Sequence, residues 1–133
     1  MKSATVIAHC AAWLALAAAA AAQTETAVKL ENLTHPEVRQ RDVRVVILPI
    51  GSTEPHANHL PYGTDTWTTD AMAARVAAKA AEKGAKVLVL PTMPYGVNTN
   101  QAPNPYAQSI RPATLTQFVK DTVDTAEQQG IRK

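Results

Sequence analysis

The chain has 133 residues, of which 46% are hydrophobic, and a formal net charge of +2 at pH 7. This length suits one domain with a single modest core. The charges form neither a basic stripe nor an acidic tail, which argues against a nucleic-acid partner and against a disordered solvating tail.

The first twenty-two residues have the pattern of a secretory signal peptide. Lys2 supplies the positive charge, an uncharged and alanine-rich stretch follows, and Ala20 and Ala22 satisfy the small-x-small rule for cleavage. The rival interpretation is an uncleaved membrane anchor. We expect residues 1–22 to be removed and residues 23–133 to form a secreted or periplasmic domain with no stable membrane association. The single cysteine, Cys10, would leave with the signal, so the mature protein would have no disulfide.

The first elements of the mature chain are a flexible start, a short helix and a strand. Residues 23–29 are expected to be flexible. Thr34 followed by Glu37 is a capping box, which predicts that a helix begins there. Residues 43–50 form a run rich in β-branched side chains that ends before Gly51, which predicts a mostly buried strand.

A helix and a second strand follow. Residues 66–83 have Met72, Val76 and Ala80 at four-residue spacing, which predicts a helix, and Gly84 is placed to end it. Residues 86–90 predict a second buried strand, and residues 92–111 a long polar loop. The loop contains Asn98, Asn100 and Gln101. A loop of this length can cover a pocket, although polar loop residues are usually solvated.

The last predicted helix begins at a second capping box, formed by Thr114 and Gln117, and ends at Gly130. One face of it would be apolar, through Leu115, Phe118, Val119, Thr122, Val123 and Ala126. Residues 131–133 look like the start of a further strand. Strands that alternate with helices predict a parallel sheet. The sequence stops where the expected third strand would start, which suggests that this chain is a fragment.

Three side chains that commonly bind divalent metals fall within twelve positions, in the run GSTEPHANHLPYGTD at residues 51–65. Glu54 and His56 are two residues apart, so on an extended chain they point to the same side. The turn residues that follow can fold Asp65 back towards them. Loops after strands commonly hold ligands in open α/β sheets. The bland alternatives are that Glu54 and His56 are ordinary loop residues and that Asp65 caps a helix. His59 is expected to hold the loop, or a partner of the metal ligands, by hydrogen bonding rather than to bind metal.

This run, from Ile50 to Asp65, resembles the signature of the creatininase (creatinine amidohydrolase) family. The resemblance extends from about Leu33 to the end of the chain and includes PYGVNTNQ at residues 94–101. The family has glycine where this chain has Ala57. The resemblance implies a three-layer α/β/α fold with a parallel sheet, here truncated after the second main strand–helix unit.

The resemblance also implies a metal-dependent hydrolase of non-peptide or cyclic amides, with two divalent ions, zinc or manganese. The residue matching Glu54 would bind one ion, the residue matching His56 the other, and the residue matching Asp65 would bridge them. The family's remaining ligands, from an Asn-Gly-His segment and a later glutamate, have no match here, so we expect this chain alone to lack the complete site. No catalytic or substrate-binding residue is assigned.

Three functions stay open on the sequence alone. The chain is part of an amide hydrolase that acts on a small-molecule amide, or an inactive fragment, or a periplasmic module that binds a metal or a small ligand. A homo-oligomer is compatible with each of them.

Overall fold

The computed structural model describes residues 2–131, so residues 132 and 133, where a further strand was expected, lie outside it. Its helices are α1 (Lys2–Ala27), α2 (His35–Arg39), α3 (Thr64–Glu82) and α4 (Pro112–Gln128), and its strands are β1 (Val45–Ile47) and β2 (Val87–Val89). Single 3-10 turns span Leu30–Asn32 and Thr99–Gln101. The predicted alternation of helices and strands is confirmed.

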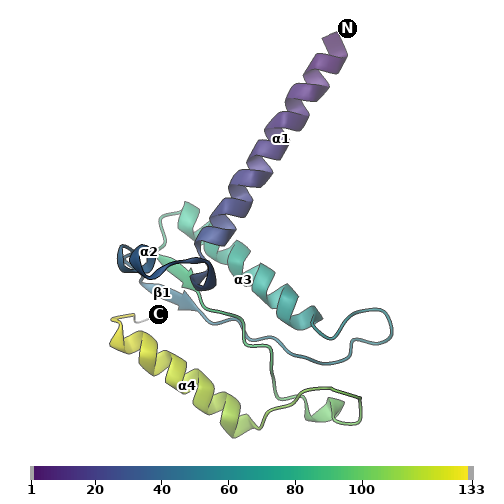
Figure 1. The fold of residues 1–133 in the computed structure, drawn as a ribbon, viewed down its shortest axis with the longest axis vertical. Helices are drawn as coiled ribbons and strands as arrows, with labels where there is room; N and C mark the ends of the chain where they lie inside the picture. The colour runs from purple at the N-terminus through teal and green to yellow at the C-terminus, as the bar shows by residue number, and fades with distance from the viewer. Residues whose placement is uncertain (1, 132–133) are drawn as a thin grey trace.

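The two strands form a parallel sheet between helices, as Figure 1 shows, with α3 on one side and α4 on the other. Val45 lies opposite Val87, and the next two pairs follow in step. Parallel strands need a crossover connection, which α3 supplies. The expected α/β architecture is confirmed.

The core lies between the sheet and α3. It contains Val28, Ala73, Ala77, Val87 and Val89, with Val45 and Ile47 packed against it. Alternate residues of a strand point to opposite faces, so Val46 and Leu88 face α4 instead, where they line a hollow. The prediction that the first strand is mostly buried is therefore wrong, because all three residues of β1 are only half-buried.

The buried face of α3 is not the one that the spacing of larger side chains suggested. Met72 and Val76 are 61% and 59% exposed, whereas Ala73, Ala74, Ala77 and Ala78 are buried. Small side chains let a helix lie close to a sheet, so alanines occupy the contact face. Gly84 ends α3 at a φ of 87°, as predicted.

The segment after α1 joins the sheet rather than staying free, so the expected flexibility of residues 23–29 is wrong at its end. Val28 is 4% exposed, and its carbonyl accepts a hydrogen bond from the Val89 N–H at 2.8 Å. Lys29 pairs with Asp70 of α3 at 2.9 Å and with Glu31 at 2.6 Å. The hydrogen bond to Asp70, and then the one to Glu31, raises the pKa of Lys29 above 10.5.

Helix α1 extends from the rest of the chain in Figure 1 and runs past Ala22 to Ala27. Among the described residues, no helix combines the length and the apolar character that crossing a membrane requires. Removal of residues 1–22 stays a prediction.

The two capping predictions have different outcomes. The Glu37 carboxylate accepts the backbone N–H of Thr34 at 2.7 Å, as expected for a capping box at the start of α2. At α4 the prediction is wrong, because the helix begins at Pro112 and its N-cap is Arg111. Proline at the first helical position has a backbone already suited to a helix, so Thr114 falls inside the first turn.

Candidate metal centre

The loop that carries the candidate ligands starts where the parallel strands end. After β1, the Gly51 N–H donates to the carbonyl of Met93 at 2.8 Å, which aligns the loop with the segment that follows β2. A Cβ atom on Gly51 would lie 2.6 Å from Cα of Thr66, in the first turn of α3. Glycine is therefore needed here, because the end of the strand and the start of the helix touch through their backbones.

Between these two points the chain makes a narrow excursion and returns. The Glu54 N–H donates to the Tyr62 carbonyl at 3.3 Å, and His56 and Leu60 form an antiparallel bridge. Ala57, at the turn, has a φ of 53°. That left-handed conformation favours glycine, which gives a physical reason for the glycine that the family has at this position.

The excursion brings Glu54, His56 and Asp65 together. Each offers one ligand atom, and these atoms all lie within 4.8 Å of one another. All three residues are half-buried. Asp65 lies in the first turn of α3, where the partial positive charge of the helix N-terminus favours a carboxylate. The convergence expected from the sequence is confirmed, whereas metal binding by these residues stays a prediction.

Both ring nitrogens of His56 are engaged. Nδ1 lies 2.9 Å from the carbonyl oxygen of Glu54, and Nε2 lies 2.9 Å from Oδ1 of Asp65. A carbonyl can only accept, so Nδ1 carries the proton in that bond. Nε2 then meets a carboxylate, an arrangement that needs a positive charge, either a proton on Nε2 or a cation shared with Asp65. In the metal-free protein the hydrogen bond to Asp65, and then that to Glu54, raises the pKa of His56 above 6.5.

This donor set fits a divalent ion. Imidazole nitrogens and carboxylate oxygens bind zinc and manganese, and a metal-binding histidine usually donates its other N–H to a carbonyl or carboxylate. Among the described residues, no hydrogen bond or ion pair engages the Glu54 carboxylate. Two ligand atoms bound to one ion at about 2.1 Å are at most about 4.2 Å apart. The spread of up to 4.8 Å therefore needs a small side-chain adjustment or a second ion.

The other histidine of the loop does not take part. His59 is exposed, and no hydrogen bond from its side chain is found in the described part of the chain. The expectation that His59 holds the loop is therefore wrong. The bridge between His56 and Leu60 and the backbone bond from Glu54 hold the loop instead.

Sequence reasoning missed a buried polar pair beside the site. Ser52 is 7% exposed and Asn98 is 8% exposed, and their side chains are hydrogen-bonded to each other. Asn98 was expected to be solvated, as loop asparagines usually are. Its place in the family-like segment 94–101 was the one available signal, and that signal did not indicate burial.

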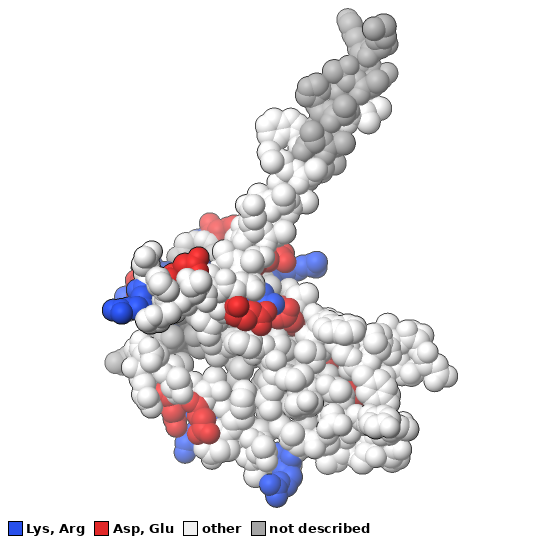
Figure 2. All heavy atoms as spheres, in the orientation of Figure 1, with Lys and Arg blue, Asp and Glu red and all other residues white. Residues whose placement is uncertain are grey.

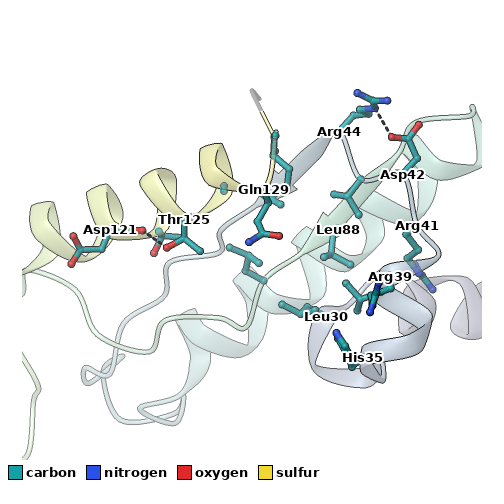
Figure 3. Close-up of a pocket in the computed structure, with 18 of the residues that line it drawn as sticks. Leu30, His35, Arg39, Arg41, Asp42, Arg44, Leu88, Asp121, Thr125 and Gln129 are labelled. Carbon is teal, nitrogen blue, oxygen red and sulfur yellow. Dashed lines mark hydrogen bonds and ion pairs between the residues drawn. The ribbon is translucent and has the colours of Figure 1, made fainter.

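A large hollow among the described residues lies elsewhere. It has a volume of about 830 Å³ and separates α4 from the second face of the sheet, between Leu88 and Phe118. Figure 3 shows Leu30, Leu88 and Thr125 around it. None of the three candidate ligands lines it, so we do not assign it to the metal centre.

One face of the molecule carries charged side chains of both signs. On the face drawn in Figure 2, Lys and Arg intermingle with Asp and Glu near the base of α1, and the described residues there form no large patch of one sign.

Comparisons with known proteins agree with one another. The family model for creatininase, described as creatinine amidohydrolase, matches residues 31–133. A creatinine amidohydrolase from Pseudomonas putida is 30% identical in an alignment of 94 residues, which covers 67% of this chain and 34% of that protein.

Solved structures give the same result. A Bacteroides fragilis protein assigned as a creatinine amidohydrolase superposes with a TM-score of 0.75 at 34% identity, over 81% of this chain and 44% of that one. A creatininase structure gives a TM-score of 0.69 at 31% identity, over 80% and 42% of the two chains. Other matching creatininase structures are described as a manganese form, a zinc form of a mutant, and a mutant in complex with creatine. The chain thus spans less than half of the length of these relatives.

Proposed function

This chain belongs to the creatininase family, and from that premise we propose that it supplies part of the metal site of an amide hydrolase, with Glu54, His56 and Asp65 as ligands. The activity is proposed for the protein as a whole, because the chain spans 42–44% of the solved relatives. Family membership does not favour the alternative of an inactive fragment or a binding module.

The observation that carries the proposal is the double engagement of His56. The Glu54 carbonyl holds Nδ1 at 2.9 Å, which leaves Nε2 beside Asp65. If the ring only formed a hydrogen bond with Asp65, no second carboxylate would be needed beside them. The Glu54 carboxylate is nonetheless within 4.8 Å of both, although like charges repel. A cation removes that repulsion, and the relatives described with manganese or zinc suggest which cations to test first.

The roles of the residues follow from their chemistry. Glu54 and His56 extend from the loop and Asp65 from the first turn of α3, so the ligands come from two elements that are held together at Gly51. Divalent ions at such a site polarise an amide carbonyl and lower the pKa of bound water. Asp65 has two oxygens and is suited to be shared between two ions. The substrate class is a small-molecule amide, and the creatine complex of a relative makes creatinine the first compound to test.

Metal binding by the chain itself is the first test. Titration with Mn²⁺, Zn²⁺ or Co²⁺ should detect weak binding, because three ligands leave each ion short of protein contacts. His56→Ala and Glu54→Gln should each weaken binding at least tenfold. His59→Ala is the matched control, since the same residue type is removed from the same loop, and it should leave the affinity unchanged. Equal effects of His56→Ala and His59→Ala would contradict the proposed ligand set.

Activity is the second test, made on the protein expressed from its complete natural gene. We expect metal-dependent hydrolysis of creatinine or another small amide, lost in Glu54→Gln while the fold is kept. A metal-loaded protein that hydrolyses no amide of a panel of cyclic and linear compounds would instead support the binding-module alternative.

Export is a separate part of the proposal. Lys2, the uncharged alanine-rich stretch and the site at Ala20 and Ala22 support cleavage before Gln23. Mass spectrometry of the protein from its native host should find Gln23 at or near the N-terminus. A protein that retains Met1 in a membrane fraction would support the anchor interpretation.

A further inference from the structure

Asn98 is buried at a distance in sequence from the candidate ligands but in contact with the loop that carries them. Its exposed fraction is 8%, and its side-chain NH₂ bonds to the hydroxyl of Ser52, two residues before Glu54. The same NH₂ donates to the carbonyl of Gln108 at 2.9 Å. Both hydrogens of the carboxamide are thus used within the protein.

Two further bonds fasten the neighbouring residue to the same long loop. The Thr53 hydroxyl donates to the carbonyl of Pro94 at 2.8 Å, and the Gln108 N–H donates to the carbonyl of Thr53 at 2.9 Å. The long loop therefore bonds to residues 52 and 53 at three points along its length, through Pro94, Asn98 and Gln108.

Ser52 also connects to the other half of the site. Its carbonyl accepts the hydroxyl of Thr66 at 3.0 Å, and Thr66 follows Asp65 in α3. A continuous set of contacts thus runs from Asn98 through Ser52 to Thr66. It joins the segment before Glu54 to the helix turn that carries Asp65.

We infer that Asn98 is a positioning residue for the metal site: its buried carboxamide fixes Ser52 and thereby sets the spacing between Glu54 and Asp65. This inference rests on the proposed function. The side chain has to be an amide, because the Gln108 carbonyl can only accept, and a carboxylate of the same shape would repel it. Partners that orient metal ligands typically change metal affinity by 10–100-fold when removed.

The test compares Asn98→Asp with Asn104→Asp in the chain. Asn104 lies in the same loop but is exposed, and its amide bonds only to the neighbouring Gln101, so it controls for the added charge. Asn98→Asp should weaken Co²⁺ binding at least tenfold and shift the visible spectrum of bound Co²⁺, which reports ligand geometry. Asn104→Asp should leave both unchanged. A folded Asn98→Asp variant with the affinity and spectrum of the unchanged chain would overturn the inference.

Two further measurements keep this inference separate from the proposed function. The side-chain NMR signals of His56, recorded without metal, should move in Asn98→Asp and not in Asn104→Asp. If the unchanged chain binds no Co²⁺ but these signals move, the metal proposal fails while the positioning of the loop by Asn98 stands. If the signals do not move, the positioning role is refuted. If Asn98→Asp does not fold, Ser52→Ala, which removes the acceptor without adding charge, should produce the same shifts, and their absence would refute the role.

Discussion

Ala57→Gly should make this protein more stable, although glycine usually destabilises. Ala57 is exposed and has a φ of 53°, so its methyl group loses no packing while its backbone is strained. The left-handed conformation costs a residue other than glycine about 1–2 kcal/mol, whereas the extra freedom of glycine in the unfolded chain costs about 0.4–1 kcal/mol. The balance is a gain of about 0.5–1 kcal/mol in the free energy of unfolding.

The assay is urea unfolding of the metal-free protein, followed by circular dichroism and extrapolated to zero urea. The matched control is Ala71→Gly, which makes the same change at an exposed position inside α3. It should lower the free energy of unfolding by about 1 kcal/mol. If both variants lose the same stability, Ala57 is not held in the left-handed conformation and our account of the loop is wrong.

Three further predictions concern the contacts around the site and the sheet. Gly51→Ala should lower stability by about 1–3 kcal/mol through overpacking and should also weaken metal binding. Gly84→Ala, with open space around it but a φ of 87°, should lower stability alone. Equal metal affinities of the two variants would contradict this. In the metal-free protein, NMR should give His56 a pKa above 6.5 that falls in Asp65→Asn, so the stabilising pair is fully present below pH 6.5 and is lost as the pH rises through the raised pKa; an unchanged pKa would refute the pairing. Lys29→Met should lower the free energy of unfolding by about 1 kcal/mol. This effect is fully present below pH 10.5 and is lost as the pH rises through the raised pKa of Lys29 in the unchanged chain, and equal stability at pH 8 would contradict it.

The sequence was informative where one local pattern decides the structure. The β-branched runs predicted both strands, although each is only three residues long in the structure. Gly84 and Gly130 were placed correctly as helix ends, and both have positive φ values. The clustering of Glu54, His56 and Asp65 followed from their spacing around a turn, which is also a local property.

What the sequence did not reveal depends on contacts between distant segments. The apolar spacing of Met72 and Val76 suggested a buried face, yet these side chains are exposed because alanines make the contact with the sheet. The size of a side chain indicates burial poorly where backbones approach closely. Asn98 gave no local sign of burial, because its partner Ser52 is 46 residues away in the sequence.

The backbone contact between Gly51 and Thr66 closes the base of the loop that carries the candidate ligands. Residues 52–65 begin and end at nearly the same point, so the length of this loop can change without moving the sheet or α3. Its tip, at the exposed Asn58 and His59, is where extra residues would disturb the ligands least. Doubling a loop costs only about 0.6 kcal/mol in closure entropy. Under the proposed function, a longer tip that reaches over a bound amide would therefore change substrate preference while Glu54, His56 and Asp65 stay in place.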